Sequence, residues 1–308
     1  MFLCILWLVV VGIGVFIQQP PPSVSPIPIP PEDGQVSGIS MAGTEPTKFP
    51  TPIHPSSSLQ EVVNQALSGT HGTYAIVIKN IKTNESYAQN EHMVFPSGSL
   101  YKLWVMAVVY EQIQNSLLAK DQVISQDVET LNKEFSIDPE IAELTEGTVT
   151  FTIYEALHQM ITISHNYAAM LLTEKVKLSS VAKFLGEYGY VESSVGTHGG
   201  LPTTTASDIA MFFDDLSAGK LANGEYTNEM IDLLKEQQLN NGIPKYLPDP
   251  SQVANKTGEI DYYKHDGGII FTNQGEYILV VLSKSDNPAG AQERIALLSK
   301  AVFDYFSQ

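Results

Sequence analysis

A hydroxyl and an amine stand three residues apart where a break in the chain is followed by an apolar helix. The segment from Phe95 to Lys102, FPSGSLYK, contains a proline and a glycine, and residues 103–109 are all apolar. A helix that is apolar on every side is predicted to lie in the protein core. Ser99 is predicted at its N-terminus, where serine is a favoured cap and unpaired backbone N–H groups collect. Lys102 shares the face above it, because residues i and i+3 are neighbours on a helix.

The amine is a candidate base for the neighbouring hydroxyl. Burial lowers the pKa of a lysine, because the charged form loses its solvation. A neutral amine beside a serine hydroxyl combines a nucleophile with its general base. The Ser-x-x-Lys pattern alone is a weak signal, since Ser180 and Lys183 repeat it. We interpret that second copy as an ordinary amphipathic helix with a solvated lysine.

Composition excludes several classes of function. The chain has 308 residues, a net charge of −17 and 43% hydrophobic residues, so most of it is globular. Such an acidic chain has no basic stripe with which to bind the phosphates of a nucleic acid. Its one cysteine, Cys4, excludes an internal disulfide and a cysteine-based metal site. The seven histidines form no His-x-x-x-His pair, and we predict neither a metal nor another cofactor.

The N-terminal part of the chain indicates export. Residues 1–17, MFLCILWLVVVGIGVFI, are apolar throughout, and a helix of that length spans about 25 Å of a hydrocarbon core of about 30 Å. The stretch lacks the basic start and small-x-small cleavage site of a signal peptide, so we favour an uncleaved signal-anchor over a cleaved export signal. Residues 18–58 are rich in proline and serine and predict a disordered linker. We expect an extracytoplasmic protein that meets the membrane only through residues 1–17.

Residues 59–308 are predicted to form the folded domain, with strands near both of its ends. Strands are predicted at 73–79, 86–89, 253–257, 268–272 and 277–282, the last two joined by a tight turn at 273–275. Helices are predicted at 59–67, 152–163, 167–172, 181–188, 206–216, 228–238 and 290–306. The expected fold class is α/β (α+β), a mostly antiparallel sheet built from both chain ends beside an inserted all-helical lobe. A cleft between two such lobes is a natural place for a site.

Two further short segments fall where that cleft is expected. Ser164–Asn166, SHN, follows an apolar helix of the helical block, and Lys256–Gly258, KTG, lies at the end of a late strand. With Ser99 and Lys102 they supply hydroxyls, amines and an amide, a set that suits acyl transfer onto a substrate bearing a carboxylate. Residues 285–287, SDN, lie between the last strand and a proline, and we predict a turn and a helix start there.

In order and spacing, these segments resemble the motifs of the class A β-lactamases and the penicillin-binding D,D-peptidases. The likeness covers roughly residues 59–308 and includes the threonine run 203–205 and the sequence Gly268–Ile270 after the third motif. It implies the β-lactamase/transpeptidase-like fold and a serine acyl hydrolase. One departure is His165, which stands where class A enzymes have an aspartate, although the peptidases tolerate other residues there.

The resemblance implies the chemistry of acylation. Ser99 would attack the substrate carbonyl and become acylated, and Lys102 would assist in removing its proton. Ser164 would relay a proton toward the leaving nitrogen. Backbone N–H groups, one of them that of Ser99, would receive the oxyanion.

The resemblance also implies how substrate is held. Asn166 would hydrogen-bond the amide side chain of the substrate, and Lys256 and Thr257 would hold its carboxylate, with Gly258 completing the motif. The second oxyanion donor is expected on the strand after Gly258, where spacing does not identify the residue. Lys264 is a loose candidate for a second contact to the carboxylate.

The likeness to class A enzymes weakens at deacylation. Those enzymes place a glutamate in a Glu-x-x-Leu-Asn loop, whereas residues 189–202 here are short and lack that pattern. Glu192 is the only carboxylate of this loop, and we expect it to be structural or solvated. His198 lies closer to the expected position and is a weak candidate for the base. The sequence therefore predicts acylation more firmly than release of the acyl group.

Three functions fit these residues. The first is a class A β-lactamase-like hydrolase that is acylated by β-lactams at Ser99 and hydrolyses them, which would confer antibiotic resistance. The second is a D,D-carboxypeptidase or transpeptidase that acts on peptidoglycan stem peptides ending in D-Ala-D-Ala and deacylates β-lactams slowly. The third is an inactive wall-binding domain. We expect a monomer with a small-molecule or peptide substrate.

Overall fold

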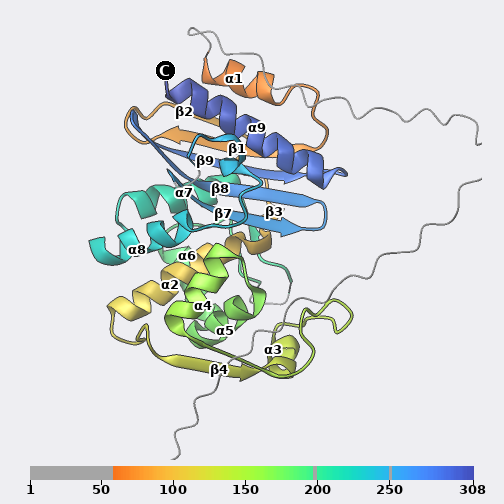
Figure 1. The fold of residues 1–308 in the computed structure, drawn as a ribbon, viewed down its shortest axis with the longest axis vertical. Helices are drawn as coiled ribbons and strands as arrows, with labels where there is room; N and C mark the ends of the chain where they lie inside the picture. Colours follow the sequence, from red (N-terminus) through yellow and green to blue (C-terminus); the bar gives the residue numbers. More distant parts are fainter. Residues whose placement is uncertain (1–57, 197–199, 250–251) are drawn as a thin grey trace, which may run out of the picture. The chain divides into compact units, whose positions relative to one another are not determined.

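A five-stranded antiparallel sheet joins the two ends of the domain, as the orange and blue strands in Figure 1 show. Its strand order is β2-β1-β9-β8-β7. The strands are β1 Thr73–Asn80, β2 Ser86–Gln89, β7 Val253–Ile260, β8 Tyr263–Thr272 and β9 Gly275–Lys284. Because β1 pairs with β9, the early strands are placed beside the late ones. The predicted mostly antiparallel sheet built from both chain ends is confirmed.

The computed structural model describes residues 58–196, 200–249 and 252–308, all of which belong to one structural unit, Lys48–Gln308. The predicted signal-anchor at 1–17 and the predicted linker up to residue 57 lie outside these ranges, as does His198. Within the described residues, no helix has both the length and the apolar character needed to cross a membrane.

The two faces of the sheet are covered by different helices. Alternate side chains of β1 and β9, such as Ile76 and Leu279, pack with α1 Leu59–Ala66 and α9 Pro288–Phe306 in one hydrophobic cluster. Their neighbours, such as Val280, face a second cluster that includes the helical lobe. This two-residue alternation is the period of a strand buried on both faces.

The helical lobe lies between β2 and β7 in the sequence. Its helices are α2 Lys102–Gln114, α3 Val128–Glu134, α4 Ile153–Thr162, α5 Asn166–Val176, α6 Leu178–Glu187, α7 Ala206–Ser217 and α8 Gly224–Lys235. Two short 3-10 helices are η1 Gly98–Tyr101 and η2 Ile243–Tyr246. Strands β3 Phe95–Pro96 and β6 Thr203–Thr204 pair with each other next to η1.

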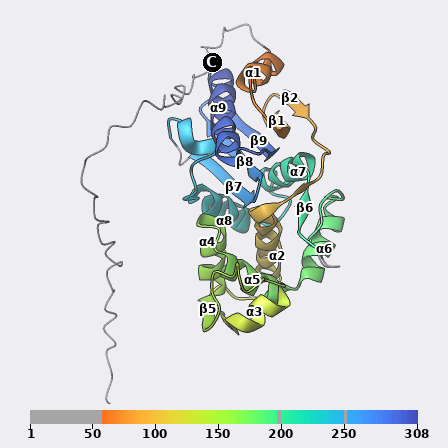
Figure 2. The ribbon, with the colours of Figure 1, turned by 90° about the vertical axis from the view of Figure 1, so that its right-hand side faces the viewer.

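Helix α2 is the centre of this lobe. Its residues from Lys102 to Tyr110 are all buried, as the apolar run predicts. The helix contacts α4, α5, α6 and α8, and Figure 2 shows it among them beneath the sheet. An amine at its first residue is therefore held away from water by the surrounding helices.

Local capping explains two of the predicted helix starts. Thr152 accepts a hydrogen bond from the Glu155 backbone N–H, and Glu155 accepts one from the Thr152 N–H, forming a capping box at the start of α4. At residues 285–287, the Asn287 side chain accepts from the backbone N–H of Gly290 and caps α9. The prediction that this SDN segment is a turn and helix start is confirmed.

The lobe also contains a two-stranded ribbon, which the expected all-helical lobe does not include. Strands β4 Val123–Asp127 and β5 Thr148–Thr152 pair antiparallel. Each strand fully buries a single side chain, Ile124 and Val149. One buried residue per strand is too short a pattern to reveal a two-residue period. The lobe is thus mainly helical, and the expectation that it is all-helical is wrong at this ribbon.

The short helix η1 is packed directly against strand β7. Gly98 has a φ of +49°, and a Cβ there would lie 2.7 Å from the backbone nitrogen of Glu259. A Cβ on Gly258 would lie 2.6 Å from the carbonyl oxygen of Ser97 and 2.9 Å from the side chain of Leu100. The two backbones can approach this closely only because both positions lack a side chain. The contacts bracket Ser99 on both sides and hold it at the edge of the sheet.

We predict that Gly258→Ala destabilises the protein and Gly186→Ala does not. The added methyl at Gly258 meets backbone atoms of η1, and overpacking of this kind costs about 1–3 kcal/mol. Gly186 lies in helix α6 with open space around its Cβ position, so alanine there is expected to stabilise by up to about 1 kcal/mol. Urea unfolding of both variants measures the difference. Equal effects of the two substitutions would contradict the close packing of η1 on β7.

Candidate active site

Lys102 is a buried amine with a complete set of acceptors. Its side chain is 0% exposed. The Nζ atom donates to the Ser164 carbonyl oxygen at 2.5 Å, to Ser164 Oγ at 3.1 Å and to Asn166 Oδ1 at 2.8 Å. All three acceptors come from the segment that precedes and opens helix α5. The first and second motifs of the sequence therefore meet in space.

Ser164 joins the second motif to the third. Its Oγ lies 3.0 Å from the Nζ atom of Lys256, which is also 0% exposed and donates to the Thr257 carbonyl oxygen at 2.9 Å. The φ of Ser164 is +60°, a left-handed conformation that is uncommon for residues other than glycine and that occurs at functional sites. One hydroxyl thus lies within hydrogen-bonding distance of two buried amines.

Both amines release a proton more readily than an exposed lysine does. Burial, reinforced by the positive charge of Lys256, lowers the pKa of Lys102 well below its usual value, and Glu143 opposes the shift. Burial lowers the pKa of Lys256 to about 7, with Asp266 and Glu259 opposing the shift. A lowered pKa leaves an amine free to accept a proton from a nearby hydroxyl.

The edge of strand β7 supplies a backbone N–H beside Ser99. The two-residue turn after β7 makes Ile260 and Tyr263 a hydrogen-bonded pair. In an antiparallel ladder the backbone N–H of the preceding residue, Glu259, then points away from β8. Strand β7 has no other neighbour in the sheet on that side. A Cβ at Gly98 would lie 2.7 Å from that nitrogen. The backbone N–H of Glu259 is therefore the candidate for the second oxyanion donor, which the sequence left unidentified.

Glu143 is a site residue that the sequence analysis missed. Its Oε1 accepts a hydrogen bond of 2.6 Å from the Nδ2 atom of Asn166, whose Oδ1 accepts from Lys102. The carboxylate belongs to the connection between α3 and β5, which carries no motif. Its distance of 23 residues from Asn166 corresponds to no regular spacing, so only the folded loop reveals it.

His265 connects the sheet to the segment that precedes Ser99. The backbone N–H of Ser283 donates to its Nδ1 atom at 3.1 Å, so the hydrogen of the neutral ring lies on Nε2, which donates to the Pro96 carbonyl oxygen at 2.9 Å. The ring is 2% exposed and packs edge-on against Phe95. His265 is a positioning residue for the turn that carries Ser99.

The other carboxylate candidate, Glu192, and the other amine candidate, Lys264, are each paired with another side chain. Glu192 accepts a hydrogen bond from the Thr205 hydroxyl and lies 3.0 Å from His92, which places it in a structural network. Lys264 forms an ion pair with Glu259.

The second Ser-x-x-Lys pattern lies outside the site. It falls in helix α6, where Lys183 is largely exposed and pairs with Glu187 one turn away. This geometry is that of an ordinary solvated helix face, as the sequence analysis interprets it.

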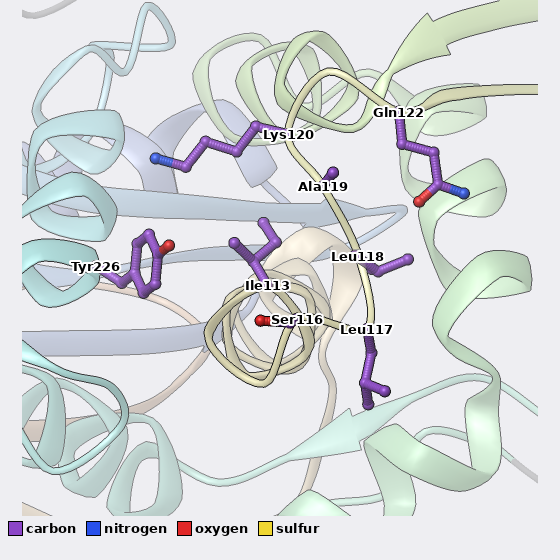
Figure 3. A pocket seen from close by; sticks show the side chains of 8 residues that line it. All are labelled: Ile113, Ser116, Leu117, Leu118, Ala119, Lys120, Gln122 and Tyr226. Carbon is purple, nitrogen blue, oxygen red and sulfur yellow. The ribbon is translucent and has the colours of Figure 1, made fainter.

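A hollow elsewhere on the lobe contains none of these residues. It lies at the end of α2 and around Lys120, as Figure 3 shows. Its lining residues are Ile113, Ser116, Leu117, Leu118, Ala119, Lys120, Gln122 and Tyr226. The amine of Lys120 is paired with Glu229 and lies over the ring of Tyr226, so it is not a free base. The buried amines and the amide described above lie instead around Ser164.

Comparisons with known proteins identify the family and the fold of the chain. A family model described as "Beta-lactamase enzyme family" matches residues 56–306. No match was found among the curated proteins. Among solved structures, a beta-lactamase from Sphaerobacter thermophilus is 23% identical, with a TM-score of 0.69 over 80% of this chain and 96% of that chain.

Two further solved structures are similar over most of their length. PBP-A is 21% identical, with a TM-score of 0.71 over 84% of this chain and 99% of that chain. A substituted form of PBP-A, solved as an acyl-enzyme complex with penicillin G, is 19% identical, with a TM-score of 0.70 over 80% of this chain and 95% of that chain. At these identities the likeness concerns the fold.

We predict that His265 makes stability fall in acid. Burial lowers the pKa of His265 to about 4, whereas an unfolded histidine titrates near pH 6.5. The folded state therefore favours the neutral ring, and the stability that this preference supplies is complete above about pH 6.5 and is lost as the pH falls toward 4. Between these values the unfolding free energy should drop by roughly 2–3 kcal/mol more than in His265→Gln. Urea unfolding as a function of pH measures this loss of unfolding free energy. Parallel curves for the native protein and His265→Gln would contradict the role given to His265.

Proposed function

The chain belongs to the beta-lactamase enzyme family and has its serine hydrolase fold, and from this premise we propose that it is a class A β-lactamase-like hydrolase acylated at Ser99. The observation that carries the proposal is the sharing of one hydroxyl, that of Ser164, by the buried amines of Lys102 and Lys256. In the proposed mechanism Lys102 is the base for Ser99, and the shared Ser164 hydroxyl is the path for its proton.

The proposed acylation begins at Lys102. Its neutral amine accepts the proton of Ser99 Oγ, and the oxygen attacks the carbonyl carbon of the β-lactam amide. The negative charge that develops on the carbonyl oxygen is stabilised by the N–H groups of Ser99 and Glu259. Both donors are fixed before substrate arrives, because η1 and β7 are packed together.

Breakdown of this intermediate requires a proton on the leaving nitrogen. Ser164 Oγ lies within hydrogen-bonding distance of both amines, so it can pass its own proton to the nitrogen and take one from a lysine. The C–N bond breaks and the acyl group stays on Ser99. The substrate carboxylate is held by Lys256 and Thr257 and its acyl amide by Asn166, as the family motifs imply.

Hydrolysis of the acyl-enzyme is proposed to be slow. Glu192, the one carboxylate of the loop at 189–202, is occupied by Thr205 and His92. This observation favours the second candidate, a D,D-carboxypeptidase or transpeptidase that acts on D-Ala-D-Ala stem peptides and is trapped by penicillins. Of the solved relatives, a form of PBP-A carries an acyl group from penicillin G.

The setting of the enzyme is also proposed from the sequence. An apolar segment at 1–17 and a proline-rich segment at 18–58 support export and a membrane tether, with the domain acting as a monomer in the extracytoplasmic space. Peptidoglycan and β-lactams are both found there.

We predict that penicillin G adds its full mass to the protein and that the adduct persists. Lys102, Ser164 and Lys256 are in contact, and the described residues of the loop at 189–202 offer no free carboxylate as a base for water, so the acyl-enzyme should decay over minutes or longer. Intact-mass spectrometry over time reports both formation and decay.

Two controls decide the assignment. Ser99→Ala should form no adduct, while Ser97→Ala, two residues away in the same turn, should still form one. The absence of any adduct on the native protein would favour an inactive wall-binding domain. Loss of the adduct within seconds, with rapid turnover of a chromogenic cephalosporin, would contradict slow hydrolysis and favour a true β-lactamase.

A further inference from the structure

The contacts of the site form a chain with a carboxylate at one end. Lys256 binds Ser164, Ser164 binds Lys102, Lys102 binds Asn166, and Asn166 binds Glu143. The end at Lys256 is positive and suits the carboxylate of a substrate. The end at Glu143 is negative, and the acylation chemistry proposed above makes no use of it.

The Asn166 amide connects this carboxylate to the substrate. Its Nδ2 atom carries two hydrogens, one of which binds Glu143 at 2.6 Å and the other of which remains for the acyl carbonyl of a substrate. A substituent on the carbon next to that carbonyl would then lie close to Glu143. Because the side chain of Glu143 is exposed, it can reach such a substituent.

The loop that carries Glu143 is fixed on the helical lobe. The next residue, Leu144, has its N–H 3.1 Å from the Tyr167 hydroxyl, and its carbonyl oxygen accepts from the Asn132 side chain at 2.8 Å. Tyr167 is 2% exposed and directly follows Asn166. Successive residues of α5 therefore hold successive residues of the loop, which places the carboxylate in a defined position.

The negative charge of Glu143 acts on two other side chains of the site. It acts on Lys102 and on His165, in each case raising a pKa that burial lowers. A group that influences these two side chains is close enough to act on a charged substrate that contacts Asn166.

We propose that Glu143 is a specificity-determining residue that selects substrates with an ammonium group on the acyl side, next to the carbonyl that Asn166 binds. The inference rests on the proposed acylation at Ser99 and names the substrate class for that site: acyl donors with a carboxylate at the leaving-group end and a cation at the other. Ile141 and Leu144, exposed beside Glu143, offer apolar contact to the alkyl or aryl part of the same group.

Three penicillins test the proposal, because they differ at a single carbon next to the acyl carbonyl. Ampicillin carries an amine there, benzylpenicillin a hydrogen and carbenicillin a carboxylate. At about pH 6 the amine is protonated. Second-order acylation rates, measured by mass spectrometry at low salt, should fall in that order by about fivefold at each step, the size expected of one exposed ion pair.

In the variant Glu143→Gln the acylation rates of the three penicillins should differ by no more than about twofold. Glutamine retains an oxygen that accepts from Asn166, so only the charge is removed. Any change in Lys102 affects all three penicillins alike and cancels in the ratios. Glu146→Gln, on the same exposed loop, is the matched control and should keep the native order.

The possible results separate the two proposals. Acylation of the native protein by all three compounds at equal rates would overturn the role of Glu143 and leave the proposed function intact. An unchanged order in Glu143→Gln would do the same. No acylation by any of the three would overturn the proposed function and, with it, the selectivity.

Discussion

Two lysines buried against one serine hydroxyl are the constraint on which the rest of the structure depends. Like charges repel strongly away from water, and each buried ammonium also loses its hydration. Lys102 and Lys256 can coexist here because carbonyl, hydroxyl and amide oxygens surround them and because both pKa values are lowered. The same features make the pair useful, since an amine that is easily deprotonated can accept and return a proton.

The fold holds this pair together from three distant parts of the chain. The buried helix α2 fixes Lys102, the left-handed backbone at Ser164 directs a carbonyl and a hydroxyl toward it, and strand β7 brings Lys256 from the other end of the domain. Glycines at 98 and 258 let the turn that carries Ser99 lie on that strand. The neutral ring of His265 anchors the same turn through Pro96, so the sheet positions Ser99 without itself carrying it.

Much of this could be predicted from the sequence, and the rest could not for identifiable reasons. The three motifs predicted that Lys102, Ser164, Asn166 and Lys256 meet, and the apolar run predicted the buried α2. The predicted start of that helix at Ser99 is wrong, because Ser99 lies in the 3-10 helix η1 and α2 begins at Lys102. Strands β7 and β8 are longer than predicted, because buried polar residues such as Asp266 break their apolar pattern. Glu143 was invisible, because Asn132 and Tyr167 place its loop through tertiary hydrogen bonds that leave no periodic signal. The role of His265 depends on the backbone carbonyl of Pro96, a contact that the sequence does not show.

The most direct test of the account is to titrate the two buried amines. NMR spectra of protein labelled at the lysine Cε carbons, recorded across the alkaline and neutral range, follow each ammonium group separately, and Lys102→Met and Lys256→Met identify the two signals. The account predicts two lysines that lose their protons well below the usual lysine pKa, that of Lys256 near 7. It also predicts that Lys256→Met raises the pKa of Lys102, because the positive charge of Lys256 contributes to lowering it. Titration of every lysine near 10.5 would contradict it.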